Sequence, residues 1–261
     1  MDISLKGKNA LIGGSSQGIG LASARELAAL GAHCTLLARN KEALEKAVQE
    51  LDTSQGQAHD YLVVDYNDSK LLEETVSRYI NGKHIHILVN NSGGPAGGPI
   101  TDATPGAFLD TFQQHLICNH ILTRLLVPGM REAQYGRIIN IISTSVKIPL
   151  KGLGVSNTIR GAVASWSKTM ANELGAYGIT VNNVLPGATA TQRLASIISS
   201  RSEKTAQAQE LITEEMMAEI PMKRFGQPEE IANVVAFLAS PAASYVNGVS
   251  IPVDGGRTGS I

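Results

Sequence analysis

A glycine-rich segment near the N-terminus has the composition of a phosphate-binding turn. It runs from Gly13 to Gly20 and joins an apolar run to a helical pattern. Glycines let a backbone turn tightly and approach a pyrophosphate, and the start of the next helix offers free N–H groups and a positive dipole end. A plain strand–helix connection is the alternative. The position after the first strand of an α/β pattern favours nucleotide binding, and the residues expected to take part are Gly14, Ser15, Ser16, Gln17, Gly18, Ile19 and Gly20.

The end of the second expected strand indicates which nucleotide would bind. A carboxylate here accepts hydrogen bonds from the 2′-hydroxyl of an NAD ribose, whereas a 2′-phosphate needs a cation. The chain has Ala38 and Arg39 at this point and no carboxylate. A guanidinium can hold phosphate oxygens in bidentate fashion. We therefore expect NADP(H) rather than NAD(H); a solvated arginine at a helix start is the alternative.

The elements that must position these residues alternate between short apolar runs and helical patterns. Strands are expected at 9–13, 33–38, 61–64, 86–89, 137–142, 179–184 and 249–253, and helices at 19–30, 41–51, 71–80, 108–130, 156–174 and 228–239. Strands that are apolar on both faces indicate a parallel sheet covered by helices on both sides. Ligands bind such sheets at the carboxyl ends of the strands. We predict a single-domain α/β Rossmann fold over residues 1–261, with a doubly wound parallel sheet of about seven strands.

Composition argues against several classes of partner. The chain has 261 residues, of which 43% are hydrophobic, a net charge of −1 and a pI of about 6.6. It has no basic block, which opposes nucleic-acid binding. No apolar run approaches the ~18 residues of a membrane span, and the N-terminus lacks an apolar signal region. Cys34 and Cys118 both lie in apolar runs and fit core thiols of a reducing compartment, so we expect a cytoplasmic protein.

Four further segments carry recognisable motifs, namely Asn90-Asn91-Ser92-Gly93, Pro186-Gly187-x-x-x-Thr191, 224–232 and Val253-Asp254-Gly255-Gly256. Together with the glycine-rich turn they resemble the short-chain dehydrogenase/reductase family, and within it the 3-oxoacyl-[acyl-carrier-protein] reductase branch. The resemblance covers nearly the whole chain. It implies a small-molecule carbonyl or alcohol substrate and a homotetramer or homodimer. It also implies that the nucleotide is contacted by Asp65, Asn91, Ser92, Gly93, Arg160, Pro186, Gly187 and Thr191.

The catalytic positions of the family differ here at three of four places. The family uses asparagine, serine, tyrosine and lysine. Ser143 stands at the serine position, just past a buried strand. Thirteen positions later Ser156 stands where the tyrosine is expected, and Arg160 replaces the lysine. His115 falls at the asparagine position, aligned by the stretch 122–130.

These replacements leave the proton donor open. A serine hydroxyl is far less acidic than a phenol, whose pKa is about 10, so Ser156 cannot simply act as the general acid. Arg160 keeps a positive charge but does not exchange protons near neutral pH. His115 has an ordinary pKa near 6.5 that suits proton exchange, with plain helix packing as the alternative. Two other Tyr-x-x-x-Lys matches, at 66–70 and 79–83, do not follow Ser143 and are rejected on topology. The histidines show no metal-site spacing, so no metal is expected.

Residues 192–220 stand where the family has its mobile substrate lid. Their apolar residues could cover an apolar substrate or pack in the core. Two functions follow. One is an NADP(H)-dependent oxidoreductase that transfers a hydride between nicotinamide and a carbonyl or hydroxyl group, with a non-standard proton donor. The other is a cofactor-binding pseudoenzyme with a regulatory or scaffolding role.

Overall fold

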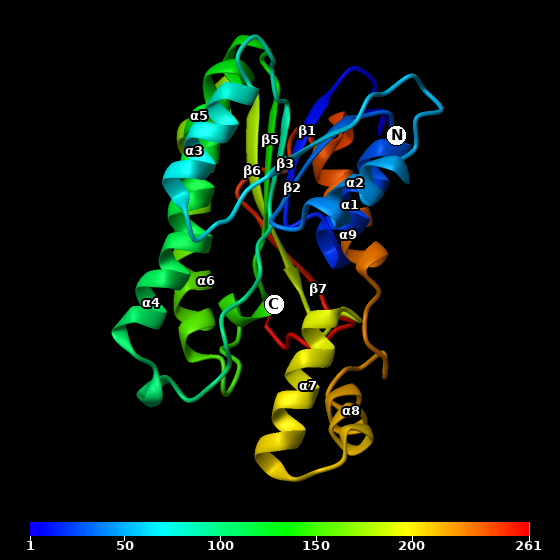
Figure 1. Ribbon diagram of the computed structural model, residues 1–261. Coiled ribbons are helices and arrows are strands. Elements are labelled where there is room, and N and C mark those ends of the chain that lie inside the picture. The colour runs from blue at the N-terminus through cyan, green and yellow to red at the C-terminus, as the bar shows by residue number, and fades with distance from the viewer. Residues whose placement is uncertain (261) are drawn as a thin grey trace.

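Seven apolar segments form the strands of one parallel sheet. They are β1 (Asn9–Gly13), β2 (His33–Ala38), β3 (Asp60–Val63), β4 (Ile87–Asn90), β5 (Gly136–Ile141), β6 (Ile179–Pro186) and β7 (Ser250–Val253). The computed structural model describes residues 1–260. The sheet order is β3-β2-β1-β4-β5-β6-β7, as expected for a doubly wound fold (Figure 1). Strand order reverses between β1 and β4, so the ligand crevice of such a sheet opens at their carboxyl ends.

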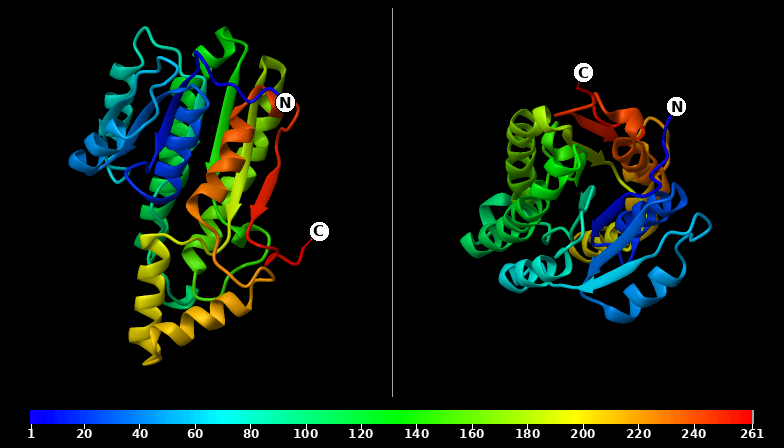
Figure 2. Two further views of the ribbon diagram at one scale, coloured as in Figure 1. Left: turned by 90° about the vertical axis from the view of Figure 1, so that its right-hand side faces the viewer. Right: turned by 90° about the horizontal axis from the view of Figure 1, so that it is seen from above.

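Helices cover both faces of the sheet. One face carries α1 (Gly18–Ala29), α2 (Lys41–Gln49) and α9 (Pro228–Ala239), and the other carries α3 (Ser69–Tyr79), α5 (Cys118–Glu132) and α6 (Gly154–Leu174) (Figure 2). Neighbouring residues of a strand point to opposite faces. Leu36 therefore belongs to the buried cluster under α1 and α9, and Leu37 to the cluster under α3 and α5. This division explains why the strands are apolar along their whole length.

The helix expected at 108–130 has an irregular centre. It begins as α4 (Pro105–Phe112), continues through a π-helical turn at Gln113–Ile117, and then becomes α5. A π-helical turn inserts an extra residue into a helix and is frequent at functional sites. His115 lies in this turn and is buried. The candidate catalytic residue His115 therefore lies in the π-helical turn of this helix.

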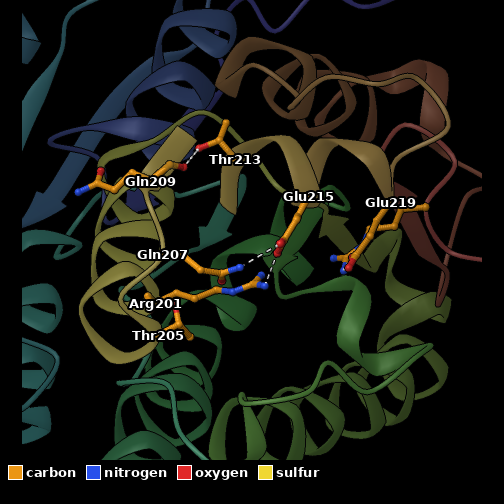
Figure 3. Close-up of polar contacts among 8 residues, drawn as sticks. Arg201, Thr205, Gln207, Gln209, Thr213, Glu215 and Glu219 are labelled. Carbon is orange, nitrogen blue, oxygen red and sulfur yellow. Dashed lines mark hydrogen bonds and ion pairs between the residues drawn. The ribbon is translucent and has the colours of Figure 1, made fainter. Parts of the chain in front are cut away.

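Two helices project beyond the carboxyl ends of the strands. They are α7 (Gln192–Thr205) and α8 (Gln209–Ala218), at the bottom of Figure 1. Leu194, Ile198 and Ile212 are buried between them. On the outer side, Arg201 Nη2 lies 2.6 Å from Glu215 Oε2 (Figure 3). Much of the apolar face expected for a substrate cover is therefore used to pack the two helices together.

A row of buried polar side chains crosses the sheet near its carboxyl edge. Asn90 Nδ2 donates to Asn140 Oδ1 at 2.9 Å, and Asn140 Nδ2 donates to Asn183 Oδ1 at 3.1 Å. Asn183 Nδ2 then donates to Ser250 Oγ at 3.0 Å. The four residues are direct partners in the registers of β4, β5, β6 and β7. Because buried polar groups are costly without partners, this row fixes the register of the strands that carry the site.

No helix among residues 1–260 combines the length and apolar character that crossing a bilayer requires.

Candidate functional site

The glycine-rich turn leaves no room for side chains where its backbone segments meet. A Cβ on Gly20 would lie 2.2 Å from the carbonyl oxygen of Gly14, which itself has φ of +56°. Ser15 is buried and ties the turn to the sheet, since its Oγ donates to Ile12 O at 2.8 Å and accepts from Leu37 N at 2.9 Å. The Gln17 side chain at the N-cap of α1 makes no capping hydrogen bond. The first N–H groups of α1, which have no partners within the helix, therefore remain available to an anionic ligand.

The residue after β4 is fastened to this turn. Asn91 Nδ2 donates to Gly13 O at 3.1 Å and to Gly14 O at 3.3 Å. β1 and β4 are adjacent in the sheet, so this contact lies at the switch point. Asn91 thus holds the shape of the turn as well as bordering the crevice.

A second loop faces the turn across the crevice. It leaves β6 at Pro186 and ends at Thr191, the N-cap of α7, whose Oγ1 accepts from Leu194 N at 3.3 Å. The Thr191 methyl lies 3.4 Å from where a Cβ on Gly18 would stand. Gly187 N donates to Val253 O at 3.0 Å and so pins the loop to β7. The Pro-Gly-x-x-x-Thr segment therefore forms the opposite wall of the nucleotide crevice.

Arg39 and Asp65 lie at the far end of the same edge. β2 and β3 are paired up to Ala38 and Val63, so both residues follow neighbouring strand ends. Arg39 is exposed and makes no ion pair within residues 1–260. Asp65 Oδ1 accepts from Asn67 N at 3.0 Å and from Asn67 Nδ2 at 2.8 Å, which is a turn-capping arrangement. The free guanidinium suits a phosphate, while Asp65 also has a local structural role.

Two of the expected catalytic side chains, Ser143 and Arg160, lie at the carboxyl end of β5, and a third, Ser156, is on the same helix as Arg160. Ser143 follows the strand, and its Oγ accepts from Ser145 N at 3.1 Å. Arg160 Nη1 donates to the carbonyl oxygen of Ile141, the last residue of β5, at 2.7 Å. Ser156 lies one turn before Arg160 on α6, and residues four apart share a helix face. The structure therefore places a hydroxyl and a guanidinium from different elements beside one strand end.

His115 meets this group from the π-helical turn. Its Nδ1 is 2.8 Å from Ser92 Oγ, and its Nε2 is buried without a hydrogen-bond partner among the described residues. Burial, followed by the positive charge of Arg160, lowers the pKa of His115 to about 2. This shift favours a neutral His115 at physiological pH and opposes its predicted role in proton exchange. The contact with Ser92 gives one ring nitrogen of His115 a local partner.

Two features of the site have no counterpart in the sequence analysis. Arg193, in the first turn of α7, donates from Nη2 to the carbonyl oxygen of Pro95 in the loop that follows β4. We call the part of the crevice that contains Ser143 and Arg160 the reaction end. A cavity of about 550 Å³ lies next to it and is lined by Ile100, Ser145, Leu150 and Asn157 among others. Arg193 stands two positions after the predicted Thr191, and this closeness in sequence could have indicated that it belongs to the site. The cavity is formed by segments that are distant in the sequence, so no local sequence pattern indicates it.

No three His, Cys, Asp or Glu side chains within residues 1–260 are placed to hold a metal ion. The glycine cradle, in contrast, fits a dinucleotide, because a Cβ at Gly20 would fill it and the start of α1 is uncapped. The residues that would hold the group are those of the turn, Asn91 and the loop that ends at Thr191.

Comparison with known proteins agrees with this geometry. A family model described as enoyl-(acyl carrier protein) reductase matches residues 14–258. The 3-oxoacyl-[acyl-carrier-protein] reductase of Pseudomonas aeruginosa is 33% identical over 257 residues, covering 97% of this chain and 98% of that protein. A chloroplastic tropinone reductase homolog of Arabidopsis thaliana is 34% identical over 259 residues, covering 98% of this chain and 77% of that protein.

A solved structure resembles the chain over its full length. The crystal structure of L-sorbose reductase from Gluconobacter frateurii, complexed with NADPH and L-sorbose, has a TM-score of 0.92 and 32% identity and covers 100% of each chain. With the parallel sheet, the glycine cradle and the family match over residues 14–258, the chain belongs to the short-chain dehydrogenase/reductase family of NAD(P)-dependent oxidoreductases.

Proposed function

We propose that the protein is an NADP(H)-dependent oxidoreductase that transfers a hydride between nicotinamide and a carbonyl or hydroxyl group of a small molecule, as a 3-oxoacyl reductase does. One observation carries the proposal. An intact dinucleotide cradle and the Ser143–Arg160 group lie at the same edge of one sheet. The names of the relatives, which include reductases of 3-oxoacyl groups and of sorbose, support a small-molecule substrate.

The preference for NADP(H) rests on Arg39. Its guanidinium has no ion-pair partner in the described chain and stands where a ribose 2′-phosphate would lie in this fold. No carboxylate takes the neighbouring position, which is Ala38. The NADPH bound to the similar sorbose reductase supports the same choice.

The chemistry divides between the cofactor and the side chains at the end of β5. Bound nicotinamide supplies or accepts the hydride. Ser143 donates a hydrogen bond from its hydroxyl to the substrate oxygen, and Ser156 offers a second hydroxyl on the facing helix. Arg160 places a positive charge beside the oxygen on which negative charge develops, which is the kind of stabilisation that lowers a barrier most. The proton that completes the product hydroxyl comes from solvent. The reaction remains possible without a general acid, since losing one slows it by about 10²–10⁴-fold.

His115 acts in this account as a neutral positioning residue. Its contact with Ser92 Oγ holds the segment after β4 against the π-helical turn. Its low pKa keeps it from adding a third positive charge beside Arg160 and Arg193. The α7–α8 hairpin then covers the side of the site that is formed by Thr191 and Arg193.

The test is NADPH oxidation with a series of ketones and 3-oxoacyl thioesters. We expect steady oxidation by the wild type and its loss in Ser143→Ala. NADPH binding with no oxidation of any carbonyl substrate would contradict the proposal.

The pseudoenzyme alternative is favoured by one observation, the loss of the family tyrosine at Ser156. The double variant Ser156→Tyr with Arg160→Lys separates the two functions. Reductase activity that appears in this variant and is absent from the parent would identify a protein that binds the cofactor but has lost the chemistry.

A further inference from the structure

The reaction end of the crevice contains two arginines from opposite walls. Arg160 comes from α6 and donates to the end of β5. Arg193 comes from α7 and donates to Pro95 on the loop after β4. The charges sense each other, because Arg193 adds to the effect of burial in lowering the pKa of Arg160 to about 10. Both charges also act on His115, which lies at the same end of the crevice.

Neither arginine has a carboxylate partner within residues 1–260. Five other arginines each contact a glutamate, namely Arg25, Arg124, Arg201, Arg224 and Arg257. Arg160 and Arg193 use backbone carbonyl oxygens instead, and those oxygens are neutral. A cleft lined by charge of one sign attracts ligands of the opposite sign and raises their local concentration. A bound anion would therefore balance charge at this end of the crevice.

The phosphates of the cofactor have other partners. The pyrophosphate is matched by the uncapped start of α1, and a 2′-phosphate by Arg39 beyond β2. Arg160 instead contacts the end of β5, next to Ser143 and the cavity of about 550 Å³. The charge of Arg160 thus lies at the strand end that Ser143 follows, where we propose that the substrate oxygen binds. The cavity wall combines apolar groups such as Ile100 and Leu150 with polar ones such as Ser145 and Lys151.

We propose that the substrate is an anionic carbonyl compound, an oxo acid whose carboxylate is held by Arg193 while its carbonyl oxygen faces Ser143. The inference rests on the proposed function and deepens it by naming the substrate class. An arginine guanidinium matches the geometry of a carboxylate and binds it in bidentate fashion. Arg193 is exposed on the first turn of α7, so a ligand can reach it and its replacement does not disturb a core.

The experiment compares 2-, 3- and 4-oxo acids with their methyl esters as substrates for NADPH oxidation. We expect kcat/KM for the best acid to exceed that of its ester by at least about tenfold. Arg193→Gln should lower kcat/KM of the acid by about 10–100-fold and leave the ester within about twofold, and Arg193→Lys should recover part of the loss. Arg201→Gln is the matched control, since it removes a positive charge from the same helix that is already paired with Glu215 (Figure 3). Arg201→Gln should leave kcat/KM unchanged for both the acid and the ester.

Three results would overturn the inference while leaving the oxidoreductase in place. The first is equal use of acids and esters by the wild type. The second is an equal loss for both in Arg193→Gln. The third is an unchanged acid-to-ester ratio with weaker NADPH binding in that variant, which would assign Arg193 to the cofactor.

A binding measurement decides the inference if no carbonyl substrate is turned over. Calorimetric titration of the NADPH-loaded protein with sodium malonate, against dimethyl malonate, needs no reaction. Malonate binding that weakens at least about tenfold in Arg193→Gln, with no binding of the ester, supports an anion site even if the proposed function fails. Absence of malonate binding, or equal binding by the wild type and Arg193→Gln, contradicts it.

Discussion

The two ends of the crevice are built from different materials. The nucleotide end depends on backbone, since Gly20 packs against the Gly14 carbonyl and Asn91 binds the carbonyl oxygens of Gly13 and Gly14. The reaction end depends on side chains, and three of its four family positions are replaced. At Gly13, Gly14 and Gly20 an added Cβ would lie within 2.7 Å of a neighbouring atom, so the cradle cannot accept a side chain at these positions without shifting. A charge or a hydroxyl can be supplied by another residue type, so the reaction end can change while the nucleotide end stays intact.

The largest effect is expected from placing a Cβ in the cradle. In Gly20→Ala the new atom would lie 2.2 Å from the Gly14 carbonyl oxygen, so the turn must shift. A backbone shift that costs about 4 kcal/mol of binding corresponds to a rise of about 1,000-fold in the Kd of NADPH. Fluorescence titration measures it.

Gly106→Ala is the control for this change. Gly106 is exposed on α4, and the nearest atom to its added Cβ would be Thr104 Oγ1 at 3.8 Å. Binding should stay unchanged, and helix propensity should stabilise the fold by up to about 1 kcal/mol. Wild-type affinity in Gly20→Ala would show that the nucleotide end is as replaceable as the reaction end.

The next effect is expected at the charge beside β5. Arg160→Met keeps an unbranched side-chain stem and removes the positive charge next to Ile141 O. We expect kcat/KM to fall about 100-fold, as on loss of one stabilising donor. Steady-state NADPH oxidation measures the loss. Arg160→Lys restores the charge and should recover activity to within about tenfold; equal losses in both variants would mean that shape rather than charge matters here.

A smaller effect is expected from protonation of His115. Its folded-state pKa is about 2, below the ordinary 6.5, so the unfolded chain binds more protons between these values and stability falls as pH drops below about 6.5. Between pH 7.5 and pH 5.0 this group contributes a loss of about 2 kcal/mol, which His115→Gln should remove. Urea unfolding at the two pH values gives the difference, from which any pH-independent cost of the substitution cancels.

His86 provides the reference for that measurement. It is half-buried, and burial followed by the Lys8 charge lowers its pKa to about 4, so it adds a loss in the same pH range. This part should persist in His115→Gln. An unaltered pH dependence in His115→Gln would mean that His115 is protonated in the folded protein.

The smallest effect is expected at Arg39. Arg39→Ser should raise the Kd of NADPH about tenfold and leave that of NADH unchanged, because only NADPH carries the phosphate. Titration with both nucleotides measures the ratio. Arg78→Ser, at another exposed arginine on α3, should leave the ratio as it is. An equal rise in the Kd of both nucleotides in Arg39→Ser would remove the basis for the NADP(H) preference.

A local sequence pattern describes the nucleotide end more fully than the reaction end, and the reason is physical. The glycine-rich turn is one continuous segment, so spacing alone describes it. The pairing of Ser92 with His115 joins residues 23 positions apart, and the contact of Arg193 with Pro95 joins residues 98 positions apart. Periodicity predicted a helix through His115 but not the π-helical turn that buries it. The low pKa of His115 depends on that burial and on two arginines from other elements, which no local pattern contains.

We propose that the altered reaction end still transfers a hydride. A single-turnover reaction with NADPH deuterated at C4 and an oxo acid tests it, followed by mass spectrometry of the product. We expect one deuterium on the former carbonyl carbon with the wild type and none with Ser143→Ala. Tight binding of the deuterated cofactor with no label in any product, together with transfer by the Ser156→Tyr and Arg160→Lys double variant, would contradict it.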